Sequence, residues 1–217
     1  MYKCFEERQR AFEAARGVYP VITGEFCAGR SQIEVAERVL DGGAKIIQIR
    51  EKEMADAPFF ELVSACRELT WKYGALLIVD DRVDIALAAQ ADGVHLGQED
   101  MPFEAARKIA PELLIGISTH NEEEMLAAQS LKPGYINIGP IFPTGTKKVG
   151  YPTVGNVELS RLIPLVKVPF SVMGGIKFHH LGELHQLGVK HIAAVSAFTQ
   201  AEDPAGEVRR WQTVLKG

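Results

Sequence analysis

Eight short apolar runs recur along the chain, and each is followed by a stretch with the residue spacing of an amphipathic helix. Each run has four to six residues and is rich in Val, Ile and Leu, which is typical of strands buried on both faces of a parallel sheet. The predicted strands are Val18–Thr23, Lys45–Arg50, Leu76–Asp80, Gly93–Leu96, Leu114–Ser118, Tyr135–Ile138, Phe170–Met173 and His191–Val195.

Helices are predicted between these strands and after the last of them. The pattern is clearest in Pro58–Lys72, where apolar residues recur at steps of three and four and form one stripe that can pack on a sheet. The other predicted helices are Gln32–Asp41, Val83–Gln90, Phe103–Ala110, Glu122–Ser130, Val157–Pro164, Leu181–Leu187 and Ala205–Leu215.

This strict alternation predicts an α/β fold with a parallel sheet and right-handed crossovers. Eight strands close a (β/α)8 TIM barrel, although an open doubly wound sheet produces the same alternation. The lack of a GxGxxG turn after the first strand favours the barrel. We therefore predict one barrel domain over residues 1–217, in which an additional N-terminal helix, Phe5–Arg16 within residues 1–17, covers the N-terminal end of the barrel.

Charge and composition restrict the partners of the chain. The formal net charge is -4 and no Lys/Arg cluster is present, so neither nucleic acid nor a membrane surface is an expected partner. No run approaches the roughly 20 apolar residues of a membrane helix. Three widely spaced cysteines, Cys4, Cys27 and Cys66, are typical of free thiols in a reducing compartment, so we expect a cytoplasmic protein. A homo-oligomer is left open.

Polar residues concentrate where the predicted strands end, which is the catalytic face of a barrel. After the second strand, Gln48, Arg50 and Lys52 lie on one side by the period of two. Other strand ends supply Asp80-Asp81, Gly97 to Asp100, Ser118 to His120, Pro143 to Lys148, Gly174-Gly175 and Val195-Ser196.

The charges of these residues indicate two anion sites in one barrel mouth. Arg50, Lys52 and Lys147 are cations suited to a polyanion such as pyrophosphate. Asp81 and Asp100 are hard oxygen ligands of the kind that bind Mg²⁺ together with phosphate oxygens. Backbone amides after the seventh and eighth strands, where barrels commonly bind a monophosphate, form the second site. Two phosphorylated substrates are therefore expected.

Each of these residues also has an ordinary structural interpretation. Asp81 and Asp100 could each cap the helix that follows, and either Ser118 or Asn121 could cap the helix after the fifth strand. Arg50-Glu51-Lys52 could form a surface ladder of ion pairs, and Gly174-Gly175 could be only a turn. His95, within a strand, is more often a hydrogen-bonded core histidine than a base. Only the combination indicates a site.

The combination resembles the thiamine phosphate synthase family. Its motifs occur in family order over nearly the whole chain from Val18 onward. They are QIREK at 48–52, DRVDIALAAQADGVHLGQED at 81–100, IGISTH at 115–120, IGPIFPTGTKK at 138–148, GGI at 174–176 and VSA at 195–197.

The resemblance implies a role for each matching residue. Gln48 would contact the pyrimidine, and Arg50, Lys52 and Lys147 would hold the pyrophosphate, with Asp80 beside it. Asp81 and Asp100 would coordinate Mg²⁺, and Ser118 would contact the pyrophosphate and the pyrimidine. Thr144 and Thr146, on a loop that closes after the sixth strand, would border both phosphate groups. Gly175, Val195 and Ser196 would bind the thiazole phosphate through backbone amides.

The implied reaction is dissociative. The pyrimidine methylene diphosphate ionises, pyrophosphate leaves against Mg²⁺ and cations, and the thiazole nitrogen attacks the carbocation. This needs no protein nucleophile, and the sequence shows no Ser–His or Cys–His pairing that would predict one. A closed loop around Gly145 would exclude water, which would otherwise trap the cation.

Three positions depart from the family pattern. Asp80 stands where the family usually has Asn, so it should repel a diphosphate unless it faces the metal or is protonated. Gly24 replaces a frequent acidic residue, and residues 149–155 diverge after the lysine pair.

These departures keep two alternatives open. One is a thiazole tautomerase, with His120 as its nearest candidate base. The other is a non-catalytic regulatory barrel that binds the phosphorylated ligands. The joint presence of Lys52, Asp81, Asp100 and Lys147 counts against the tautomerase, which has no use for a diphosphate site.

Overall fold

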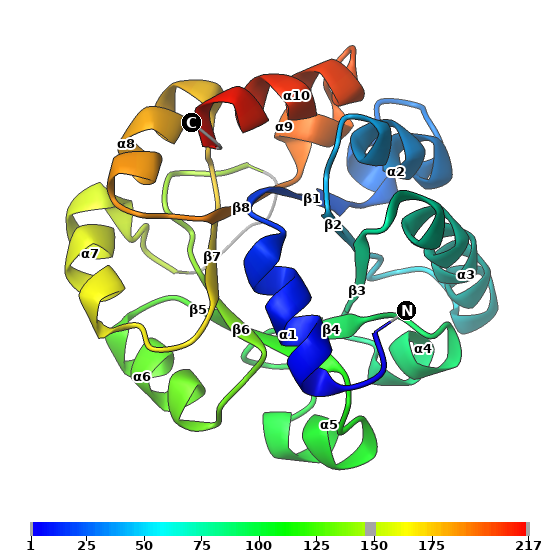
Figure 1. Cartoon of the computed structure of the whole chain (residues 1–217), viewed down its shortest axis with the longest axis horizontal. Helices are drawn as coiled ribbons and strands as arrows, with labels where there is room; N and C mark the ends of the chain where they lie inside the picture. The colour runs from blue at the N-terminus through cyan, green and yellow to red at the C-terminus, as the bar shows by residue number, and fades with distance from the viewer. Residues whose placement is uncertain (1, 146–150, 216–217) are drawn as a thin grey trace.

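A closed barrel of parallel strands, in chain order from β1 to β8, forms the centre of the molecule (Figure 1). The computed structural model describes residues 2–145 and 151–215. Pairing of β1 with β8, with Tyr19 opposite Ala193, closes the barrel and rules out the open sheet. The strands are β1 Gly17–Ile22, β2 Ile46–Ile49, β3 Leu76–Asp80, β4 Gly93–Leu96, β5 Leu114–Thr119, β6 Tyr135–Ile138, β7 Phe170–Met173 and β8 His191–Ala194.

The helices follow the predicted order, and one short helix was not predicted. This helix, α9 Ser196–Thr199, directly follows β8, where the sequence indicated only a strand end. The predicted helix Val157–Pro164 begins earlier, and its last turn is the 3-10 helix η2 Ile163–Leu165, which contains the proline. The remaining helices are α1 Phe5–Ala14, α2 Gln32–Asp41, α3 Asp56–Tyr73, α4 Val83–Ala88, α5 Phe103–Ile109, α6 Glu122–Ser130, α7 Gly155–Leu162, α8 Leu181–Gln186 and α10 Pro204–Leu215, with 3-10 helices η1 Gly24–Phe26 and η3 Phe178–His180.

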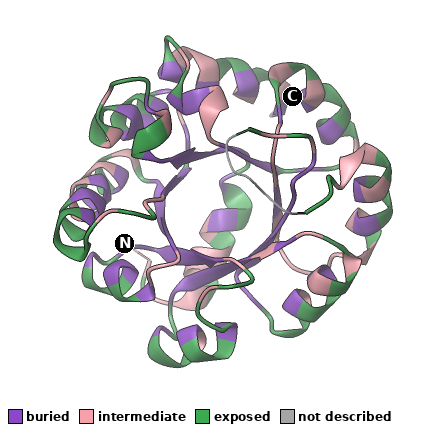
Figure 2. Cartoon of the chain, turned by 180° about the vertical axis from the view of Figure 1, so that it is seen from behind, coloured by how far each residue is buried: buried purple, intermediate pink, exposed green. Residues whose placement is uncertain are grey.

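The helices form an outer layer whose inner faces pack on the strands. Figure 2 shows buried residues along the strands and on the inward sides of the helices, with exposed residues facing outward. On α3 the predicted apolar stripe is buried, including Phe59, Val63 and Cys66. The strand interiors are buried on both faces, which explains why their sequences are continuous apolar runs.

The additional helix α1 closes the N-terminal end of the barrel, as predicted (Figure 1). Phe12 of α1 is fully buried and stacks on Tyr135, with 4.3 Å between ring centroids, and on His191, with 4.5 Å. The Nε2–H of His191 donates to the carbonyl of Phe12 over 2.8 Å. An aromatic floor therefore separates the barrel interior from solvent at this end.

Burial of His191 should make the stability of the fold depend on pH. Burial lowers the pKa of His191 from 6.5 to about 4, so between these values the unfolded chain binds a proton that the folded chain does not. Stability is therefore retained above pH 6.5 and falls as the pH drops towards 4. Between pH 7 and pH 5, the free energy of unfolding of the unaltered protein should decrease by about 2 kcal/mol more than that of the His191→Gln variant. Urea titrations of both proteins measure this difference, and parallel pH profiles would contradict it.

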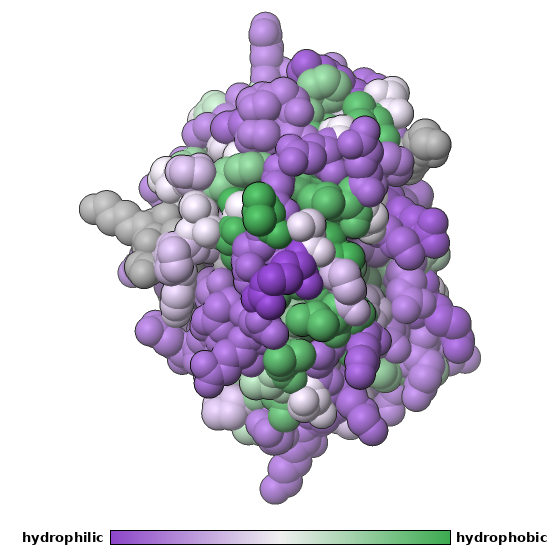
Figure 3. Space-filling model, turned by 90° about the vertical axis from the view of Figure 1, so that its left-hand side faces the viewer, coloured by the Kyte–Doolittle hydropathy of each residue, from purple (hydrophilic) through white to green (hydrophobic). Residues whose placement is uncertain are grey.

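The outer surface mixes polar and apolar side chains. Figure 3 shows the side that carries α7, where apolar residues lie among hydrophilic ones and a strongly hydrophilic side chain lies near the centre. Val157 of α7 is 88% exposed. No helix in the described part of the chain has the length and apolar character needed to cross a membrane. The homo-oligomer stays a prediction.

Candidate active site

A cavity of about 490 Å³ opens where the carboxyl ends of the strands meet. Eight of the thirteen residues predicted for the site line it. They are Gln48, Arg50, Asp80, Ser118, Thr144, Gly175, Val195 and Ser196. Lys52, Asp81 and Asp100 lie beside it rather than in its lining, and Thr146 and Lys147 lie outside the described residues.

Asp80 holds two of the predicted diphosphate-binding cations. Its Oδ2 lies 3.3 Å from Arg50 Nε and 3.3 Å from Lys52 Nζ, and Lys52 also pairs with the carboxylate of Asp81. Burial raises the pKa of the Asp80 carboxyl, and the charges of Lys52 and Arg50 act in the opposite direction. Arg50 and Lys52 therefore face an acid on the cavity wall and do not form a surface ladder with Glu51, whose carboxylate accepts from the Gly24 amide over 2.6 Å.

Neither Asp81 nor Asp100 caps the helix that follows it, so the capping interpretations are wrong. Asp81 has a positive φ of 59°, and Arg82 rather than Asp81 is the N-cap residue of α4. Asp100 Oδ2 accepts from the Gly97 amide over 2.7 Å, which folds the loop after β4 back on itself. The Asp81 carboxylate pairs with Lys52, and the Asp100 carboxylate is held by its own loop beside the cavity.

These carboxylates fit a magnesium ion that also binds phosphate oxygens. Asp80 ends β3, Asp81 directly follows it and Asp100 lies in the loop after β4, so hard oxygen donors follow neighbouring strands. Asp80 Oδ2 is buried and is held by its ion pairs with Arg50 and Lys52. Among the described residues there is no cluster of three or more acidic, His or Cys side chains that could hold a metal unaided. Mg²⁺ commonly takes one or two carboxylates and completes its shell with water and substrate phosphates, so the donor set suits it.

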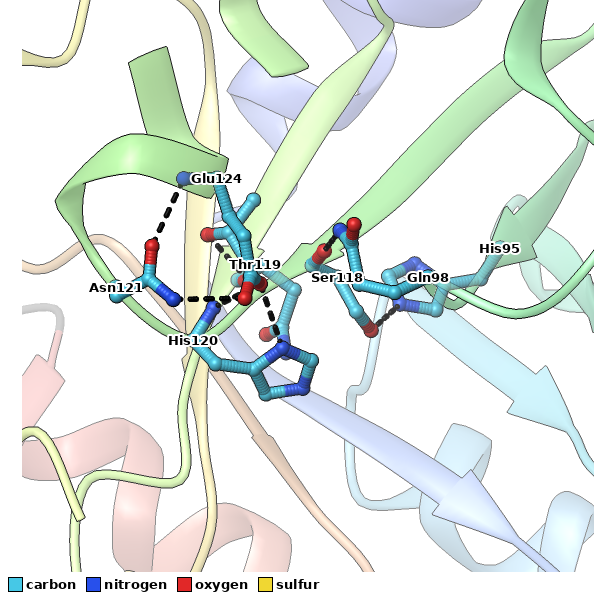
Figure 4. A network of polar contacts seen from close by, with 8 residues as sticks. His95, Gln98, Ser118, Thr119, His120, Asn121 and Glu124 are labelled. Atoms are coloured by element: carbon cyan, nitrogen blue, oxygen red, sulfur yellow. Dashed lines mark hydrogen bonds and ion pairs between the residues drawn. The ribbon is translucent and has the colours of Figure 1, made fainter. Parts of the chain in front are cut away.

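Ser118 is hydrogen-bonded to His95, a pairing that the sequence did not predict. Its Oγ lies 2.8 Å from His95 Nε2, and its carbonyl accepts from Gln98 Nε2 over 2.5 Å (Figure 4). Of the two predicted caps of α6, Asn121 is confirmed and Ser118 is wrong, because the Asn121 side chain accepts from the Glu124 amide. The expectation that no Ser–His pair exists is likewise corrected.

His120 also lines the cavity and is fixed by its neighbours. Its Nδ1 lies 2.7 Å from Glu124 Oε2, which also accepts the His120 amide over 2.9 Å (Figure 4). The imidazole stacks on Tyr151 with 3.7 Å between ring centroids. The residue is therefore held as part of the cavity wall.

The loops after β7 and β8 bring backbone close to the cavity. Gly175 has a φ of +64°, and a Cβ there would lie 2.4 Å from the Pro143 carbonyl oxygen, so no other residue fits without displacing the β6 loop. Val195 and Ser196 line the same cavity at the start of α9. This arrangement resembles the phosphate sites of other barrels.

Known proteins share both the sequence and the fold of this barrel. A family model described as thiamine monophosphate synthase matches residues 18–198. The chain belongs to this family. A thiamine-phosphate synthase of Pelotomaculum thermopropionicum is 39% identical over 199 residues, which cover 91% of each chain. One from Methanospirillum hungatei is 40% identical over 201 residues, covering 92% of this chain and 97% of the relative.

A solved structure agrees with this membership of the thiamine monophosphate synthase family. Thiamine phosphate pyrophosphorylase from Pyrococcus furiosus has a TM-score of 0.86 at 36% identity, covering 93% of this chain and 96% of its own. The expected family is therefore confirmed. A geranylgeranylglyceryl phosphate synthase from Thermoplasma acidophilum, at 15% identity and a TM-score of 0.70, shares the fold alone.

Several residues of the site in this family member escaped the sequence analysis. Lys177 lines the cavity just after the GGI motif, where the sequence did not indicate a cation in addition to Arg50, Lys52 and Lys147. Tyr19 and Tyr135 looked like ordinary strand residues, yet their hydroxyls meet inside the barrel. Successive side chains of a strand point to opposite faces of the sheet, so only the expected inward orientation of these two tyrosines could have indicated them.

Proposed function

We propose that the chain joins 4-amino-2-methyl-5-hydroxymethylpyrimidine diphosphate to 4-methyl-5-(2-phosphoethyl)thiazole, or to its carboxylate, to give thiamine phosphate and pyrophosphate. The observation that carries this proposal is one cavity lined on one wall by the Arg50 guanidinium and on another by the backbone of the loops after β7 and β8, which we propose are two separate anion-binding regions. Arg50, with Lys52 beside it, forms one region, and the backbone at Gly175 and Ser196 forms the other. Family membership supplies the identity of the substrates.

In the proposed complex, Asp81 and Asp100 would hold Mg²⁺ together with diphosphate oxygens. The ion would neutralise charge on the departing pyrophosphate. Lys52 lies against Asp81 in the ligand-free protein, and a bound diphosphate would draw it away from that carboxylate. Lys147 is proposed to contribute a further cation and Thr146 a hydroxyl, by the resemblance alone.

The remaining side chains orient the reactants and stabilise the leaving group. Arg50 would donate to diphosphate oxygens, and Ser118 and Thr144 would contact the same group from the other walls of the cavity. Gln48 would hold the pyrimidine, and Gly175, Val195 and Ser196 the thiazole phosphate. Ionisation then depends on leaving-group electrostatics and on the alignment of the thiazole nitrogen.

We also propose that this reaction takes place in the cytoplasm. Cys27 and Cys66 are buried free thiols, as suits a reducing compartment. The partners in the proposal are small phosphorylated molecules, and none of its steps uses a nucleic acid or a membrane.

The direct test is an assay of both products. The chain is incubated with the pyrimidine diphosphate, the thiazole phosphate and Mg²⁺, and pyrophosphate and thiamine phosphate are quantified. We expect equimolar products and loss of turnover after EDTA treatment, restored by excess Mg²⁺. Isomerisation of a thiazole carboxylate phosphate alone would instead support a tautomerase, and binding without turnover would support a regulatory barrel.

Asp80→Asn should retain or increase activity. Asp80 competes with the diphosphate for Arg50 and Lys52, and asparagine removes that negative charge while keeping the side-chain shape. We expect the KM for the pyrimidine diphosphate to fall by about tenfold, because the negative charge of Asp80 repels the negatively charged diphosphate and weakens its binding. Steady-state kinetics measure this change. A large loss of turnover would show instead that Asp80 is a metal ligand in its own right.

A further inference from the structure

A chain of hydrogen bonds crosses the barrel interior beneath the cavity and joins two of the proposed substrate-binding residues. Gln48 Nε2 lies 2.9 Å from the hydroxyl of Tyr19, which lies 2.9 Å from the hydroxyl of Tyr135. The Tyr135 hydroxyl is 3.0 Å from His95 Nδ1, and His95 Nε2 is 2.8 Å from Ser118 Oγ. Five side chains from five different strands are thus connected in series.

The two tyrosines in the middle of this series of hydrogen bonds are buried, and the residues at its ends line the cavity. Tyr19 and Tyr135 are 2% and 0% exposed, whereas Gln48, His95 and Ser118 line the cavity. Burial raises the pKa of both tyrosines well above the ordinary value, so each keeps its single hydroxyl hydrogen. Each tyrosine can therefore donate one hydrogen bond along the chain, and its oxygen must accept the other.

One donor at the end of such a series determines the direction of every bond in it. The amide nitrogen of Gln48 can only donate, so Tyr19 accepts from it and donates to Tyr135. Tyr135 then donates to His95 Nδ1. A neutral imidazole with an accepting Nδ1 carries its hydrogen on Nε2 and donates it to Ser118 Oγ.

We propose that Gln48 sets the direction of this hydrogen-bond chain, so that His95 is held as the Nε2–H tautomer and Ser118 presents its hydroxyl hydrogen to the ligand in the cavity. Tyr19, Tyr135 and His95 are positioning residues in this scheme. The Ser118 carbonyl is fixed separately by Gln98, so the hydroxyl hydrogen is the part of Ser118 that the chain controls (Figure 4).

The direction of the hydrogen bond from His95 to Ser118 matters for the proposed function, on which this step of the inference rests. A serine that accepts from His95 is a hydrogen-bond donor for an oxygen of the leaving diphosphate. The reverse direction would have Ser118 donate to His95, which is how an adjacent base activates a serine nucleophile. A nucleophilic oxygen beside a carbocation would trap it, so the inferred direction suits a reaction in which only the thiazole nitrogen should attack.

The test is the tautomer of His95 in the ligand-free protein, measured by long-range ¹H–¹⁵N NMR with His95 assigned by substitution. We expect a pyridine-type Nδ1 and a pyrrole-type Nε2 in the unaltered chain. In Gln48→Glu at pH 8 the carboxylate can only accept, so Tyr19 and Tyr135 must reverse and the two nitrogen shift types must exchange. A purely structural role for Gln48 would not move the tautomer of a residue that it does not touch.

A matched double variant isolates the route. In Gln48→Glu with Tyr19→Phe the series is cut, so the exchange of nitrogen shifts must disappear. A protonated Nδ1 in the unaltered chain, an imidazolium there, or an unaltered tautomer in Gln48→Glu would each overturn the proposal. The result is independent of catalysis: an inactive protein with the expected tautomer contradicts only the proposed function, and an active one with the reverse tautomer contradicts only this inference.

Discussion

Replacing Asp100 with asparagine is expected to lower turnover by about 100- to 1,000-fold, because it removes one of two charges proposed to hold Mg²⁺ against the leaving pyrophosphate. Asparagine keeps a side-chain oxygen that can accept from the Gly97 amide, now 2.7 Å from Asp100 Oδ2, so the loop after β4 should be preserved. We therefore expect an unchanged Tm together with a raised Mg²⁺ requirement. Steady-state kinetics over a Mg²⁺ series and a thermal melt measure the two effects.

Asp84→Asn is the matched control for this experiment. Asp84 pairs with Arg82 at the exposed start of α4 and does not line the cavity. Asp84→Asn therefore makes the same chemical change as Asp100→Asn, but outside the proposed metal site. Its turnover should stay within about twofold of the unaltered chain, as is usual for an exposed ion pair. Equal losses in both variants, or full activity in Asp100→Asn, would remove Asp100 from the proposed metal site.

Asp92→Asn is expected to destabilise the fold by about 3–5 kcal/mol, since it leaves a buried guanidinium without its counter-charge. Asp92 Oδ2 lies 2.5 Å from Arg67 Nη1 and also accepts the Leu77 amide over 2.9 Å. Only 4% of the Arg67 side chain and 3% of the Asp92 side chain are exposed. This pair fastens α3 to the starts of β3 and β4, and denaturant unfolding at neutral pH measures its loss.

An exposed ion pair of similar length shows whether burial is responsible. Glu158 and Arg161 on α7 are 2.6 Å apart, with 40% and 54% of their side chains exposed. Glu158→Gln should change the free energy of unfolding by less than about 1 kcal/mol. If the two substitutions have similar effects, desolvation of Arg67 is not the cause of the larger one.

The fold could be predicted from the sequence because most strands are buried on both sides and helices such as α2, α3 and α10 carry a buried apolar stripe. Strand bounds agree to within one residue at either end, as in β2, which spans Ile46–Ile49 where Lys45–Arg50 was predicted. The exceptions are local. α9 has only four residues, which is too short for helical periodicity to appear, and the last turn of the predicted helix Val157–Pro164 is a 3-10 helix.

The candidate site could be predicted as a set of residues but not as a network of contacts. Motif order placed Gln48, Asp80 and Gly175 at one mouth, and the cavity contains all three. What Asp80 contacts could not be read from its neighbours in sequence, because Arg50 and Lys52 reach it from another strand. The hydrogen-bond connection from Gln48 to Ser118 could not be predicted for the same reason, because its intermediate residues come from β1, β4 and β6.

The aromatic floor formed where α1 meets Tyr135 and His191 restricts how substrates enter the barrel and how products leave it. With that end plugged, the described residues offer the carboxyl-end opening as the shared entrance and exit of the cavity. Two molecules that must meet inside cannot pass each other in such a dead end. The reactant that sits deeper therefore has to bind first, and of the two products the one that lies nearer the opening has to leave first.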